Sequence, residues 1–123
     1  MILGNVVALQ ARINLTFILT EQPNANLEFV IDTGFEGALT LSPDTIEFLN
    51  LPYVQEMSAN LADDSSVKAN IHSATVLWNG AELEVAVLAM GRRPLLGTAL
   101  LEKLHLGVDF EENGTVTISD MAK

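Results

Sequence analysis

Alternating apolar and polar residues near the start of the chain predict β-strands. Between Val6 and Leu19, the odd positions from Ala11 to Phe17 are apolar and the even positions from Arg12 to Thr16 are polar. A period of two residues is typical of a strand with one buried face. This segment therefore predicts one or two strands, and a turn over residues 22–26 leads into a further apolar strand over residues 27–31.

The middle of the chain predicts two hairpins. Residues 54–61 and 67–77 are expected to form the arms of a long hairpin, with the polar residues 62–66 at its tip. Asn79-Gly80 is a dipeptide that favours tight hairpin turns, so residues 75–78 and 83–88 are expected to pair across it.

Two short helices are expected beside these strands. Ser42-Pro43-Asp44 combines a hydroxyl N-cap, a first-turn proline and a first-turn acid, and this helix is expected to end near Asn50. Thr98 is expected to cap a second helix that runs through Leu104 and is stopped by Gly107. Asn113-Gly114 then turns the chain into a last strand, so we expect one mainly β domain over residues 1–123.

The apolar strand Phe29–Ile31 runs directly into Asp32-Thr33-Gly34. Burying an unpaired charge is costly, so an acid at the edge of a core is normally partnered, protonated or functional. This tripeptide alone is common, but a second apolar-apolar-glycine pattern follows at Leu95-Leu96-Gly97, and a short helical pattern follows each. The pair of patterns is a much more specific indication than either alone.

With these two motifs the chain resembles the retropepsin-like aspartic proteases. The resemblance spans most of the chain, including an acidic hairpin at Asp63-Asp64 where the family has its flap, and residues 106–110 after the second helix. The extended motif over residues 32–41 resembles the small prokaryotic branch, whereas Phe35 and Thr98 depart from the retroviral pattern. The resemblance implies an acid-protease closed β-barrel with two short helices and one lobe per chain.

Aspartic peptide hydrolysis needs two carboxyl groups that share one water and one proton. The chain has a single Asp-Thr-Gly, and the matching second position, Leu95-Leu96-Gly97, has no acid. One chain therefore cannot supply both carboxyl groups, but a symmetric homodimer can place Asp32 opposite its own copy. We expect a homodimeric aspartic endopeptidase that acts on a peptide or protein substrate.

The resemblance also assigns roles to the neighbours of Asp32. Gly34 lets the backbone approach closely, Thr33 hydrogen-bonds across the two-fold axis, and Leu96 with Gly97 supports the Asp32 loop. The hairpin tip would close over the substrate through Ala62, Asp63, Asp64 and Ser65. The two ends of the chain, residues 1–9 and 115–119, resemble the strands that interlace in the family's dimer.

The formal charge of −10, from 16 acids and 6 bases, argues against nucleic acids and anionic membranes as partners. It serves solubility first, and it also favours basic or neutral peptides over acidic ones. The chain has no cysteine, so it cannot form a thiolate metal site, and His72 and His105 lack metal-ligand spacing, so both are expected to be structural. The aspartic endopeptidase that the resemblance implies uses neither a metal nor an organic cofactor. Without a basic signal-peptide start or a spanning apolar run, a soluble cytoplasmic protein is expected.

Two other functions fit the same residues. The chain could be a catalytically weak or inactive dimeric module that binds peptides in its groove, or a β-domain in which Asp32 only serves its turn. Asp63 and Asp64 are also typical of solvated loop acids. Arg92-Arg93 is typical of a surface pair, with contact to the catalytic loop or an ion pair as the alternative.

Overall fold

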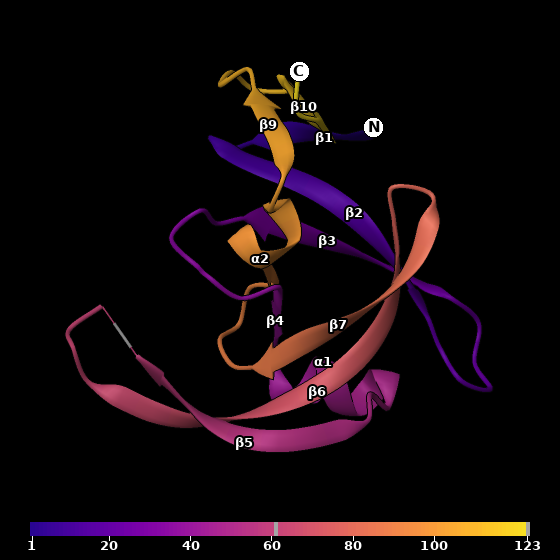
Figure 1. Cartoon of the computed structure of the whole chain (residues 1–123), viewed down its shortest axis with the longest axis vertical. Helices are drawn as coiled ribbons and strands as arrows, with labels where there is room; N and C mark the ends of the chain where they lie inside the picture. The colour runs from indigo at the N-terminus through magenta and orange to yellow at the C-terminus, as the bar shows by residue number, and fades with distance from the viewer. Residues whose placement is uncertain (61, 123) are drawn as a thin grey trace.

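The computed structural model describes residues 1–60 and 62–122, which contain ten strands and two short helices (Figure 1). In chain order they are β1 (Ile2–Val7), β2 (Gln10–Ile18), β3 (Ala25–Ile31), β4 (Leu39–Leu41), α1 (Pro43–Leu49), β5 (Tyr53–Asn60), β6 (Ser66–Trp78), β7 (Ala81–Ala89), β8 (Leu95–Leu96), α2 (Thr98–Leu101), β9 (Leu104–Val108) and β10 (Thr115–Asp120).

The strands form one sheet in the order β5-β6-β7-β4-β8-β3-β2-β1-β10-β9. β6 also pairs with β2, through Thr16–Leu77, Phe17–Val76 and Ile18–Thr75, so the sheet bends round until these two strands meet. The predicted mainly β class with two short helices is confirmed, and closure into a barrel stays a prediction.

The predicted alternation on β2 sets the core. Phe17 of β2 and Phe29 of β3 are both fully buried, and their rings stack with centroids 5.9 Å apart. Stacked aromatic pairs add to the stabilisation from burial of their apolar surface. The other fully buried large side chains are Ile13, Leu15, Leu39, Leu41, Leu96, Ile118, Val6, Val76, Val87 and Val116.

Two tight turns organise the strand order. Asn79 and Gly80 have φ values of 51° and 86°, as expected for the hairpin turn that joins β6 to β7. Ala8 and Leu9 also have positive φ values, 51° and 61°, and they turn the first segment into two strands, β1 and β2.

The first helix agrees with the prediction and the second differs from it. Ser42 caps α1, since its Oγ accepts the N–H of Thr45 at 3.2 Å, and Asn50 ends the helix in the left-handed conformation. The prediction that Thr98 caps a helix through Leu104 is wrong, because Gly97 holds the cap position and α2 ends at Leu101. Residues 104–108 pair with β10 instead, so strand pairing replaces the helix there.

The two terminal strands, β1 and β10, lie together at one end of the molecule (Figure 1). β1 pairs with β10, from Ile2–Ile118 to Asn5–Thr115, and β10 also pairs with β9. The strands expected to interlace between subunits are thus paired within one chain, and their part in a dimer stays a prediction. In the described residues, no helix has the length and apolar character needed to cross a membrane.

The buried aromatic pair provides a test of the core. Phe17→Ala should lower the free energy of unfolding by about 3–5 kcal/mol, because it removes a buried ring and leaves a cavity. Phe48→Ala is the matched control, since Phe48 of α1 is 82% exposed and its loss should change stability by less than about 0.5 kcal/mol. Urea unfolding measures both, and equal effects would contradict the assigned core.

Candidate active site

Asp32 lies on a tight turn directly after β3. Its backbone N–H donates to Leu96 O at 2.9 Å, and its own carbonyl accepts the N–H of Phe35 at 3.1 Å. The N–H of Gly34 donates to Asp32 Oδ1 at 2.9 Å. The Asp32 side chain is half-buried whereas Thr33 and Gly34 are exposed, so the turn presents its hydroxyl and backbone outward.

The structure brings the two sequence motifs together through β8. This two-residue strand lies between β3 and β4, parallel to β3 through Val30–Leu95 and Ile31–Leu96, and antiparallel to β4. The N–H of Val30 also donates to Pro94 O at 3.0 Å. Leu96 is therefore a fully buried neighbour of the strand that carries Asp32, which is where a supporting residue must lie.

The start of α2 fastens the loop that follows Asp32. The N–H groups of Gly97, Thr98 and Ala99 donate to three carbonyl oxygens of that loop, those of Ala38 at 2.9 Å, Phe35 at 2.8 Å and Gly37 at 3.2 Å. The first N–H groups of a helix have no partner within the helix, so these three bonds satisfy them and hold the loop at once. Thr98 Oγ1 adds a bond to the carbonyl of Phe35 at 3.3 Å.

Gly97 is required by the closeness of this contact. A Cβ atom at position 97 would lie 2.2 Å from Gly37 O and 2.5 Å from Phe35 Cδ2. A Cβ at Gly37 would lie 2.5 Å from Phe35 Cζ. The ring of Phe35, which departs from the retroviral pattern, thus occupies the space that two glycines leave open.

Two adjoining cavities form a groove beside the Asp32 turn. The first, of about 460 Å³, is bordered by Asp32 and is called the Asp32 cavity; the second has about 520 Å³ and lies toward the β5–β6 hairpin. Gly34, Phe35, Asn60 and Leu88 border both. The remaining residues of the Asp32 cavity are Thr40, Met90, Gly91, Arg92, Arg93 and Leu95, and those of the second are Glu36, Gly37, Ala38, Leu39, Met57, Ser58, Ile71 and Ala86.

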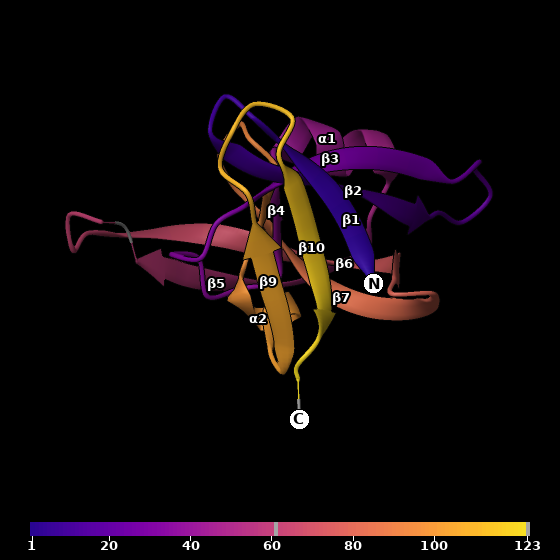
Figure 2. The same cartoon turned by 90° about the horizontal axis from the view of Figure 1, so that it is seen from above.

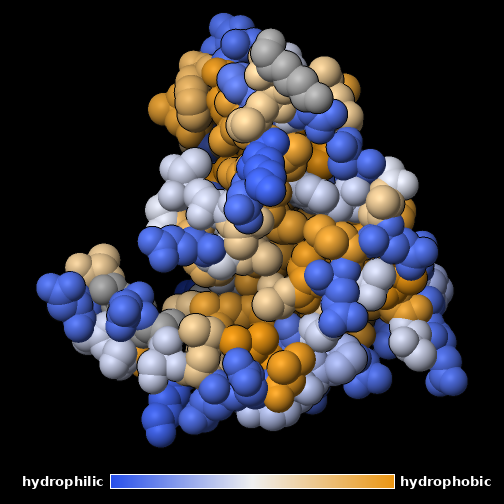
Figure 3. Space-filling view, in the orientation of Figure 1, coloured by the Kyte–Doolittle hydropathy of each residue, from blue (hydrophilic) through white to orange (hydrophobic). Residues whose placement is uncertain are grey.

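The β5–β6 hairpin projects from the body of the molecule, and a hollow separates its outer part from the rest (Figures 2 and 3). Among the described residues, the arm of the hairpin borders the groove through Met57, Ser58 and Asn60, whereas Ala62 to Ser65 at the tip do not. The sequence pointed to the tip and missed the arm. Leu61, which precedes the tip, lies outside the described residues.

The tip acids differ in their surroundings. Asp63 Oδ1 accepts the Oγ hydroxyl of Ser65 at 2.5 Å and its N–H at 3.0 Å. These hydrogen bonds, the hydroxyl first, hold the pKa of Asp63 below its ordinary value. Asp64 takes a positive φ of 64°, which completes the tight tip.

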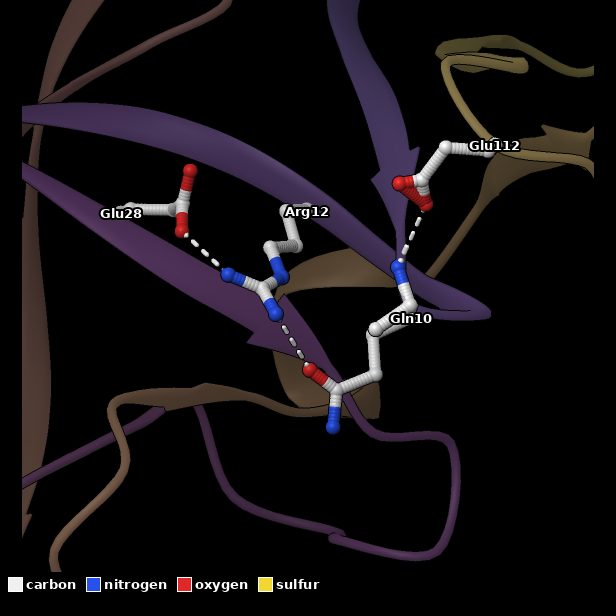
Figure 4. Close-up of polar contacts among 5 residues, drawn as sticks. Gln10, Arg12, Glu28 and Glu112 are labelled. Carbon is white, nitrogen blue, oxygen red and sulfur yellow. Dashed lines mark hydrogen bonds and ion pairs between the residues drawn. The ribbon is translucent and has the colours of Figure 1, made fainter.

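Arg12 of β2 links this strand to β3, through a side-chain bond to Glu28 (Figure 4). Its Nη1 donates to Glu28 Oε1 at 2.9 Å and its Nη2 to Gln10 Oε1 at 2.9 Å, and Arg12 pairs in register with Val30, just before Asp32. Its Nε is buried and has no hydrogen-bond partner within the described part of the chain. This cluster ties the strands together and does not border the groove.

His72 has structural surroundings, whereas His105 of β9 is exposed. His72 Nδ1 lies 2.9 Å from Leu51 O, and its ring meets the edge of Tyr53 with centroids 5.6 Å apart. Over residues 1–60 and 62–122, no three side chains of the His, Cys, Asp or Glu type converge where they could hold a metal ion.

The contact between Gly97 and the Asp32 loop can be tested by adding one methyl group. Gly97→Ala should lower the free energy of unfolding by about 1–3 kcal/mol, because its Cβ would overlap a backbone carbonyl that cannot move freely. Gly34→Ala is the matched control, since its Cβ would meet only Asp32 Oδ1, at 3.2 Å, and should cost less than about 1 kcal/mol. Chemical denaturation compares them, and a tolerated alanine at position 97 would refute the close contact.

The hairpin tip can be tested by titration. Ser65→Ala removes the hydroxyl that stabilises the charged form of Asp63, so the pKa of Asp63 should rise toward its ordinary value. Ser66→Ala, a change at the next residue, should leave that pKa in place. A lowered pKa stabilises the folded tip at pH values above the unfolded pKa, and this contribution is lost as the pH falls through the folded pKa. The difference in stability between the parent and Ser65→Ala should therefore vanish in strong acid. NMR of the Asp63 carboxyl carbon as a function of pH measures the pKa. An unchanged pKa in Ser65→Ala would contradict the role assigned to the Ser65 hydroxyl.

Comparison with known proteins places this geometry in a known fold. No protein-family model matches the chain, and no curated protein matches it. Among solved structures, it is similar to a crystal structure of a retropepsin-like aspartic protease from Rickettsia conorii, over 100% of this chain and 91% of that chain, with a TM-score of 0.62 and 19% sequence identity. At that identity the likeness shows the fold. The predicted resemblance is thus confirmed at this level: the chain has the fold of a retropepsin-like aspartic protease.

Proposed function

We propose that the protein is an aspartic endopeptidase whose active site forms between two copies of the chain. The observation that carries the proposal is the position of Asp32, half-buried on a braced turn and facing a groove, in a fold shared with a retropepsin-like aspartic protease. Function in such a fold depends on the site and not on the fold alone. The groove is lined mostly by apolar residues, as expected for a site that takes peptide side chains.

The single carboxylate is the reason for proposing a dimer. Among the described residues that border the Asp32 cavity, Asp32 is the one acid, and the corresponding turn at Leu95-Leu96-Gly97 offers none. A two-fold axis beside the turn would bring a second Asp32 to the first. Thr33 is exposed on that turn, which leaves its hydroxyl free to bond across the axis.

The proposed reaction uses one protonated and one ionised Asp32. Water adds its oxygen to the peptide carbonyl carbon, the ionised carboxylate takes one of its protons, and the other carboxyl gives its proton to the carbonyl oxygen. The C–N bond of the tetrahedral diol then breaks as the nitrogen takes a proton from the first carboxyl, the one that was ionised at the start and took its proton from water. A diol hydroxyl returns a proton to the second carboxylate, so the pair recovers its single proton.

The β5–β6 hairpin would hold the substrate over this pair. An extended peptide can bond to exposed backbone as an added strand, with alternate side chains entering pockets. The arm residues Met57, Ser58 and Asn60 border the groove, and the tip residues 62–65 extend beyond it, where they would close over a bound peptide.

The alternative is a dimeric peptide-binding module without useful activity. The Asp32 carboxylate already accepts the Gly34 N–H within its own turn, so a purely structural role for this acid has an observation in its favour. A module of this kind would use the same groove and the same hairpin. Cleavage separates the two functions, whereas peptide binding does not.

Replacing the proposed catalytic acid tests the function. Asp32→Asn keeps the shape of the side chain but cannot act as a base, so cleavage of a peptide library should fall to background at every pH. Asp44→Asn, an exposed acid in the first turn of α1, is the matched control and should cleave like the parent. Sedimentation should show a dimer for the parent and both variants. Equal cleavage by parent and Asp32→Asn, or a parent that is monomeric and active, would refute the proposal.

A further inference from the structure

Arg92 and Arg93 are unusual in this chain for their position and their lack of acidic partners. The chain has 16 acids and 6 bases. Arg12 is bound to Glu28 and Lys68 lies 3.8 Å from Glu56, yet within the described residues neither Arg92 nor Arg93 forms an ion pair. Both are exposed, so their charges are available to a ligand.

The loop that carries these arginines is held firmly at the groove. It joins β7 to β8 and turns at Gly91, with a φ of 75°. The buried hydroxyl of Thr40 donates to Arg93 O at 3.3 Å and accepts the N–H of Leu95 at 3.1 Å. Val30 N–H of β3 also donates to Pro94 O at 3.0 Å. Since β8 lies between β3 and β4, bonds from both of these strands hold the loop backbone and fix where the two arginines stand.

Both arginines border the Asp32 cavity. The rest of its lining is largely apolar, with Phe35, Leu88, Met90 and Leu95. A guanidinium group beside an apolar wall binds a carboxylate more strongly than one in open water, because two parallel N–H···O bonds form where water competes less.

We propose that Arg92 and Arg93 select peptides with an aspartate or glutamate close to the cleaved bond. This inference rests on the proposed function, since it names the substrate class of the same groove. It also reverses, at the groove, the preference for basic or neutral peptides that the net charge of −10 suggests. Surface charges beyond about 8–10 Å are screened at physiological salt, whereas a paired arginine in the cavity acts at contact distance.

Matched peptides measure the selection. The substrates are octapeptides with Leu-Phe at the centre. They come in pairs, one with a Glu and the other with a Gln at the same position, and there is one pair for each of the six remaining positions. For the parent, kcat/KM should favour the Glu peptide by about tenfold or more at one position near the cleaved bond, the size expected for a charge-assisted pair. In the double variant Arg92→Gln with Arg93→Gln, the Glu-to-Gln ratio at that position should fall to near one.

Lys103→Gln is the control for charge alone. Lys103 is exposed and does not border the groove within the described residues, so its replacement should leave both the cleavage rate and the Glu-to-Gln ratio of the parent. Arg92→Gln and Arg93→Gln alone give the same readout if the double variant does not fold. A parent without a Glu preference, or a ratio unchanged in the arginine variants, would overturn the inference.

A binding measurement separates this inference from the proposed function. The same octapeptides, labelled with fluorescein, are titrated with Asp32→Asn protein and with the triple variant that also carries both arginine replacements. Tighter binding of Glu peptides that is lost in the triple variant would support the selection even if the parent cleaves nothing. Cleavage without a Glu preference would leave the function standing and refute the selection. A dimer that becomes monomeric on replacing the arginines would place them at the subunit contact, and also refute it.

Discussion

Three backbone hydrogen bonds at the start of α2 hold the site together. The N–H groups of Gly97, Thr98 and Ala99 bind the carbonyl oxygens of the loop that follows Asp32. Each bond satisfies a helix donor that would otherwise be left without a partner, so the helix start and the loop depend on one another. The helix start and the loop can approach this closely only because position 97 has no side chain. The position of Asp32 at the groove follows from this contact and from β8, which lies beside β3.

Local structure could be predicted from the sequence wherever one residue type has a strong preference. The cap at Ser42 and the turn at Asn79-Gly80 are examples, and both are as predicted. The turn at Ala8 and Leu9 could not be predicted in this way, since neither residue favours a positive φ. There the pairing of β1 with β2 determines the backbone conformation of the turn. The same reason explains why α2 ends early, because residues 104–108 gain a full ladder with β10.

The centre of the candidate site could be predicted, and its walls could not. Asp32 and Gly97 belong to short motifs whose pattern is visible in the sequence. The walls come from distant segments that only the folded sheet brings together, represented by Asn60 of β5 and by Leu88 and Arg93 of the stretch from β7 to β8. Their residue types do not mark them out in the sequence, since apolar strand residues and a pair of arginines are common on any β-protein. Charge shows the same limit: the chain is strongly acidic, yet its groove carries two arginines.

Mixing parent with inactive chains tests most directly whether one active site needs an Asp32 from each of two chains. Parent and Asp32→Asn proteins are unfolded together at several ratios, refolded, and assayed for peptide cleavage at constant total protein. With random pairing, activity should follow the square of the parent fraction and fall to about one quarter in an equal mixture. Activity that falls in direct proportion, to about one half in the equal mixture, would mean that each chain acts alone and would contradict an active site shared by two chains.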